Sequence, residues 1–182
     1  MTSDICAAVA EPPLWRATVP VFDAALVRLD RTVAKAVAAL GDGAAAALAR
    51  RPAEGMLPAG QQVATAAQFT LRIAYPLAGR RAPEVRGGLD AAGLAGRIAE
   101  TRTLLAALPR EDFAGAEGRR IRFQAGFADL ECEGEAFLHG FGLLNLYFHH
   151  AMAHVALKQA GVRLGKADFD GRHDYPEGFS LV

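Results

Sequence analysis

The stretch WRATVPVFDAALVRLDRTVAKAVAAL, residues 15–40, decides the fold. Its apolar side chains recur every three or four residues, which places them on one face of a helix. That face carries Trp15, Val19, Phe22, Leu26, Leu29, Val33, Val37 and Leu40. Pro13 precedes the pattern and Gly41 follows it, as is typical of helix ends, whereas Pro20 falls inside and predicts a kink or a late start. A helix with so long an apolar face needs other helices to cover it.

Three further helices are predicted over residues 60–77, 89–108 and 135–160, each with helical spacing of its apolar residues. Residues 120–132 instead alternate polar and apolar on either side of Ala125-Gly126, which predicts a β-hairpin. Four long helices with short connections predict a mostly α protein, a four-helix bundle with a small β-hairpin before the last long helix. We expect a single domain over residues 1–171 and a surface tail over residues 172–182.

The composition of the chain argues against several classes of partner. The chain has 182 residues, with 20 Lys and Arg against 20 Asp and Glu, so its net charge of 0 argues against a nucleic-acid partner. No apolar run approaches the length of a membrane-spanning helix, and the first ten residues carry Asp4 but no Lys or Arg. We therefore predict a cytoplasmic protein with no membrane partner. Cys6 and Cys132 lie too far apart in sequence to predict a disulfide framework or a Cys-based zinc site.

The last predicted helix carries the candidate chemistry. Taken as one uninterrupted helix, it turns one face to the core, with Phe137, Phe141, Leu144, Phe148, Met152 and Val155. Asn145 and His149 flank this face, while His139, His150 and His154 point the other way. Residues four apart on a helix can share one metal ion, which makes His150 with His154 a candidate pair and Asn145 with His149 a weaker one. The alternative for His150 and His154 is a pair that faces solvent or an interface. The alternative for Asn145 and His149 is a half-buried pair satisfied by hydrogen bonds.

The same helix is also apolar on its outer side, where Leu143, Leu146 and Tyr147 are expected. A helix that is apolar all round is covered on both sides. Either the hairpin or a second copy of the chain is predicted to cover this side, the second case giving a homodimer.

Five segments along the chain together resemble a known family. They are Thr18–Phe22, Met56–Pro58 with Gln62-Val63, Phe113–Glu117, Gly140–His149 and Gln159–Phe169. In this order they resemble the bacterial domain-of-unknown-function family 1993, over residues 14–171. That family is similar to the DinB/YfiT-like superfamily of four-helix bundles, which implies the same fold here.

The resemblance also implies where a site would lie. Many DinB-like proteins hold a metal ion with three histidines, one from the second long helix and two, four residues apart, from the last. Some of these proteins are thiol-dependent transferases or hydrolases. The matching positions in this chain are Gln62, Asn145 and His149, so two of the three histidines are missing.

We therefore expect a degenerate DinB-like site at Gln62, Asn145 and His149, which binds a small molecule or serves packing and holds no metal cofactor. The alternative is a divalent-metal-dependent enzyme of the thiol transferase or hydrolase class. It would bind zinc or nickel at His149, or at His150 and His154.

Overall fold

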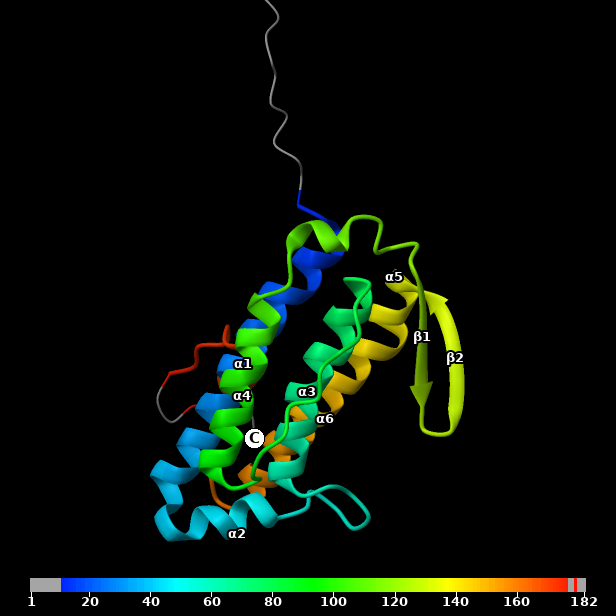
Figure 1. Ribbon diagram of the computed structural model, residues 1–182. Helices are drawn as coiled ribbons and strands as arrows, with labels where there is room; N and C mark the ends of the chain where they lie inside the picture. Colours follow the sequence, from blue (N-terminus) through cyan, green and yellow to red (C-terminus); the bar gives the residue numbers. More distant parts are fainter. Residues whose placement is uncertain (1–10, 177–178, 180–182) are drawn as a thin grey trace, which may run out of the picture.

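The computed structural model describes residues 11–176 and 179. Four long helices lie side by side in it, and the short helix α2 (Ala44–Ala49) crosses one end of the bundle (Figure 1). The long helices are α1 (Pro13–Leu40), α3 (Ala59–Leu77), α4 (Ala91–Ala106) and α6 (Leu143–Gln159). Helix α1 continues through Pro20. The predicted four-helix bundle is confirmed.

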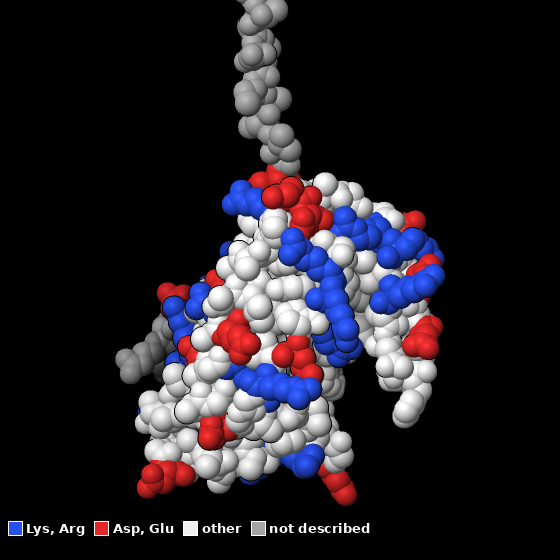
Figure 2. All heavy atoms as spheres, viewed as in Figure 1, with Lys and Arg blue, Asp and Glu red and all other residues white. Residues whose placement is uncertain are grey.

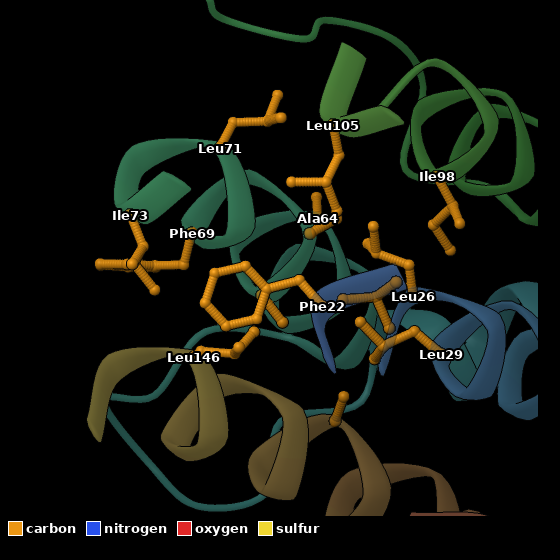
Figure 3. Packing of buried hydrophobic residues seen from close by; sticks show 14 of the residues in the cluster. Phe22, Leu26, Leu29, Ala64, Phe69, Leu71, Ile73, Ile98, Leu105 and Leu146 are labelled. Carbon is orange, nitrogen blue, oxygen red and sulfur yellow. The ribbon is translucent and has the colours of Figure 1, made fainter. Parts of the chain in front are cut away.

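The core lies between these helices, where their apolar faces meet (Figure 3). Phe22 and Leu26 of α1 are fully buried against Ile73 of α3 and Leu105 of α4 in one continuous cluster. Each such side chain contributes about 1.5–3 kcal/mol through its removal from water. The apolar periodicity of the sequence therefore predicted the core of α1, α3 and α4.

Helix α1 and the short helix after it form a long apolar stretch that is partly buried in the bundle. By length and composition alone, the helical stretch from Pro13 to Ala49 could cross a membrane. In the bundle, Phe22, Leu26 and Leu29 on this stretch are fully buried by the neighbouring helices. Core packing therefore accounts for part of its apolar composition, and 33% of its most apolar window is buried.

The predicted hairpin is present as β1 (Arg120–Ala125) and β2 (Ala128–Glu133), paired antiparallel. Gly126 closes the turn with a φ of 60°, a left-handed conformation that glycine adopts without strain. An isolated two-stranded hairpin is marginal in water, so it needs an anchor. The Phe123 ring supplies one, with its centroid 5.0 Å from that of Phe137 and 4.5 Å from that of Phe141. Cys132 on β2 is a free thiol, and Cys6 lies outside the described residues.

The last long helical segment is not one uninterrupted α-helix. A short helix, α5 (Gly134–Phe137), runs into a π-helical turn over Leu138–Gly142, and α6 follows. A π turn contains one residue more than an α turn, so every later side chain is rotated relative to an ideal wheel. A Cβ at Gly142 would lie 2.8 Å from Cγ1 of Ile73 in α3, so glycine lets the α6 segment pack closely on the Ile73 side chain.

This turn makes part of the wheel prediction wrong. Leu144 and Phe148, which the wheel placed in the core, are 63% and 49% exposed. Leu146 and His150, which the wheel turned outward, are 0% and 2% exposed. The physical reason is the extra residue in the π turn, which shifts the buried face of α6 along the sequence.

The segment from Val162 to Asp170 packs on the bundle. Val162 and Leu164 are buried, and α7 (Lys166–Asp170) packs against α1. Lys35 of α1 and Asp168 of α7 form an ion pair of 2.5 Å. Of the tail predicted for residues 172–182, residues 177–178 and 180–182 lie outside the described part of the chain.

Two glycines of the π turn test this account of α6. Gly142→Ala should lower the free energy of unfolding by about 1–3 kcal/mol, because the new methyl group overlaps Ile73. Gly140→Ala is the matched control, since a Cβ there meets nothing within 4 Å and alanine favours a helix over glycine. Urea denaturation of both variants measures the difference. Equal stability of the two variants would contradict the close approach of α6 to α3.

Candidate functional site

The structure brings two of the three predicted site residues into direct contact. Gln62 lies in the first turns of α3 and is buried, while His149 lies on α6 and is half-buried. Nδ1 of His149 is 2.6 Å from Oε1 of Gln62. The Gln62 amide nitrogen donates to the carbonyl oxygen of Leu57 at 3.3 Å, just before α3 begins. This second bond orients the amide so that its oxygen faces the imidazole.

These contacts determine the protonation of the His149 ring. The Gln62 oxygen can only accept, so Nδ1 of His149 carries the hydrogen and donates it. Burial, together with the positive charge of Arg72, lowers the pKa of His149 below its ordinary value. The ring is therefore neutral near pH 7, and its Nε2 carries a lone pair that can accept a hydrogen bond.

Aromatic rings enclose this imidazole. The Phe69 ring of α3 stacks on it, with centroids 5.5 Å apart and planes 22° apart, and Phe148 meets it edge-on at 5.3 Å. Arg72 lies over the Phe69 ring, at 4.5 Å from its centroid. The sequence analysis missed Phe69. Its position seven residues after Gln62, on the same face of α3, is a signal that could have identified it.

Asn145 takes no part in the Gln62–His149 pair. Its amide nitrogen donates to the carbonyl oxygen of Phe141, one turn earlier in the same helical segment, at 2.8 Å. It is half-buried, as the wheel placed it. The three matching positions therefore form one hydrogen-bonded pair and one neighbouring amide that bonds within its own helix.

His150 and His154 lie elsewhere, and the outward position predicted for His150 is wrong. His150 is 2% exposed, and its ring centroid lies 4.5 Å from that of Phe169 in α7. His154 is half-buried beside the same ring, at 6.2 Å. Nε2 of His150 and Nδ1 of His154 are buried and have no hydrogen-bond partner among the described residues. Burial lowers the pKa of both, that of His150 to about 4, with Arg28 as a second cause.

The donor set does not suit a DinB-like metal ion. Over residues 11–176 and 179, no three His, Cys, Asp or Glu side chains are grouped so that they could hold one. Gln62 uses its oxygen for His149, and Asn145 offers an amide oxygen, which zinc and nickel bind less readily than imidazole or thiolate. At the predicted site, His149 Nε2 is thus the one strong metal donor.

Charged side chains near the hairpin are largely paired. Figure 2 shows lysine and arginine gathered on this part of the face, between the top of the bundle and the strands. Arg120 and Arg122 of β1 both pair with Glu131 of β2, and Arg80 pairs with Asp112 at 2.5 Å. Exposed pairs of this kind contribute little stability, but they reduce the positive potential of this surface.

Removal of the imidazole tests the Gln62–His149 bond. His149→Ala should lower the free energy of unfolding by about 1–3 kcal/mol, because it leaves the buried Gln62 oxygen without a donor. Asn145→Ala is the control and should cost less than about 1 kcal/mol, since it removes one local bond to a helix carbonyl. Chemical denaturation measures both, and an equal loss in the two variants would refute the bond.

Acid stability tests the burial of His150. The unfolded chain takes up a proton at this residue near pH 6.5, whereas the folded chain does so only near pH 4. The free energy of unfolding is therefore unaffected by protonation of this residue above pH 6.5. It falls as the pH drops toward 4, by about 3 kcal/mol in total. His150→Leu should reduce this loss, and substitution of the exposed His139 by leucine should not. An unchanged pH profile in His150→Leu, measured by urea denaturation at each pH, would contradict the assignment.

Comparisons with known proteins agree with this architecture. The family model for DUF1993, a domain of unknown function, matches residues 14–170. Among solved structures, a DinB family member protein from Shewanella denitrificans is similar, with a TM-score of 0.79 and 28% sequence identity. The match covers 89% of this chain and 94% of that chain. No curated protein matches. The chain therefore belongs to the DUF1993 family and has the fold of a DinB family protein.

Proposed function

We propose that this chain is a small-molecule-binding bundle protein whose ligand contacts His149 and which uses no metal ion there. The observation that carries the proposal is the bond between His149 Nδ1 and Gln62 Oε1. It fixes one tautomer of a neutral imidazole, so that Nε2 is kept as a hydrogen-bond acceptor. Within the described residues no side chain or backbone group donates to Nε2, and a ligand O–H or N–H group would satisfy it.

The surrounding rings indicate the kind of molecule that suits this acceptor. Phe69 stacks on the imidazole and is 4% exposed, while Phe148 stands edge-on to it and is 49% exposed. The exposed face of Phe148 could pack against an apolar body while Nε2 of His149 accepts one hydrogen bond from it. The proposed ligand class is a small aromatic molecule with a hydroxyl donor.

The metal-dependent enzyme is the second candidate, and one observation favours it. A histidine whose Nδ1–H is held by an oxygen presents Nε2 to a metal ion in many metalloproteins, and His149 has this arrangement. The other donors at the site do not suit zinc or nickel, because Gln62 is engaged and Asn145 supplies an amide. We therefore derive no catalytic step for a thiol transferase or a hydrolase.

A pair of neutral probes tests the proposed ligand class. 4-Methylphenol carries the hydroxyl donor, and 4-methylanisole has the same ring with the donor replaced by an ether. Titration of the chain at millimolar probe, followed by NMR of the histidine rings, should show 4-methylphenol shifting the His149 signals. The ether should bind about tenfold more weakly, which corresponds to the loss of one hydrogen bond.

Two variants and one metal measurement complete the test. His149→Phe keeps an aromatic ring but removes the acceptor, so it should abolish the preference for 4-methylphenol, while Asn145→Ala should preserve it. Equal binding of both probes, or no binding of either, would overturn the proposal. Stoichiometric zinc or nickel in the untagged protein, lost in His149→Phe, would favour the metal-dependent enzyme instead.

The homodimer stays a prediction. The apolar residues of α6 that a second copy could cover differ from those expected from the sequence. Leu146 is buried, whereas Leu144, Tyr147, Phe148 and Val155 of α6 are between 38% and 63% exposed. These four residues, spaced along one face of α6, form the apolar surface that a second copy would cover.

A further inference from the structure

A groove lies on the bundle between α1, α6 and α7, apart from the Gln62–His149 pair. It encloses about 450 Å³, which is within the range of small-molecule sites. Its walls are mainly apolar and include Val21 and Ala24 of α1, Tyr147 of α6 and Phe169 of α7. The groove is therefore suited to an apolar body of modest size.

Arg28 gives this groove an unpaired positive charge. Its guanidinium lines the groove, its Nε is buried without a hydrogen-bond partner, and it forms no ion pair with a described residue. Arg28 as a whole is half-buried, but its Nε is shielded from water and lacks an acceptor, which costs free energy. An anionic group in the groove could supply that acceptor.

Asp170, the acidic residue of the groove lining, is already engaged. Its Oδ1 accepts hydrogen bonds from the backbone nitrogens of Arg172 and His173, at 2.9 and 3.2 Å. Its Oδ2 pairs with Nδ1 of His173. These bonds hold the pKa of Asp170 at about 2 and direct the carboxylate to the turn after α7. With Arg28 and Arg172 against Asp170, the groove lining carries one net positive charge (2 − 1 = 1).

A second unpartnered group, His150, contacts Phe169, which is one of the residues that line the groove. His150 is 2% exposed, lies under the Phe169 ring at 4.5 Å, and has no partner for its Nε2. Buried polar atoms without partners are rare in folded proteins, and here two of them, from Arg28 and His150, are found beside the same groove.

We propose that this groove binds a small monocarboxylate with an apolar body, whose carboxylate pairs with Arg28. The guanidinium presents donors that match the two oxygens of a carboxylate. The apolar walls exclude water around the pair, which strengthens it, and they bury the hydrocarbon part of the ligand. A single net charge favours a monocarboxylate over a multiply charged anion.

Three probes separate this proposal from simple apolar binding. Hexanoate has both the charge and the apolar chain, 1-hexanol lacks the charge, and acetate lacks the chain. Calorimetric titration of the full chain should give the tightest binding for hexanoate. Binding of 1-hexanol and of acetate should each be about tenfold weaker or more.

The variants test the residues. Arg28→Met keeps an unbranched apolar stem but removes the guanidinium and its charge, and it should weaken hexanoate about tenfold or more. Arg31→Met, at an exposed position three residues along α1, should not. Ala24→Trp fills the groove from an exposed position and should abolish binding, which serves as the test if Arg28→Met does not fold.

His149→Phe should leave hexanoate binding intact, so the two proposals can fail separately. Equal binding of hexanoate and 1-hexanol, unchanged binding in Arg28→Met or in Ala24→Trp, or no binding of hexanoate would overturn the proposal.

Discussion

The close approach of Gly142 to Ile73 is the constraint on which the rest of the structure depends. A larger side chain at position 142 would force a shift, because a Cβ there would lie 2.8 Å from the Ile73 side chain. The last helical segment accommodates this contact with a π turn over Leu138–Gly142. The turn sets the rotation of α6, and with it the side chains that α6 presents to the core, to α3 and to solvent.

That rotation gives two adjacent histidines different chemical environments. His149 reaches Gln62 across the α3–α6 interface, and the bond between them selects one tautomer. His150, one residue later, lies beneath α7 with an unpartnered Nε2. Burial lowers the pKa of both rings, yet only the first has a partner that orients it. Orientation by Gln62 is what makes His149 the stronger candidate for ligand contact.

The family likeness and the site chemistry lead to different conclusions. The fold is that of a DinB family protein over most of the chain. At the positions that match the DinB-like histidines, however, an amide orients one imidazole and a second amide bonds within its own helix. A fold can be retained while the donor set of its site changes, so the function has to be argued from the side chains present. Here the side chains present are one imidazole and two amides, and the proposed function rests on them.

The sequence by itself determined the elements. Apolar spacing predicted the four helices and the alternation around Gly126 predicted the hairpin, because each pattern reflects the burial of one face of a regular element. The family resemblance pointed to Gln62, Asn145 and His149, and the structure joins the first and the last of them. Only the tertiary structure decided which residues of α6 are buried, since one extra residue in a π turn rotates all later side chains by about 100°. The tertiary structure alone also shows that Arg28 and Phe169 line the same groove. Contacts between such distant segments depend on how the helices pack, and they leave no periodic pattern in the sequence.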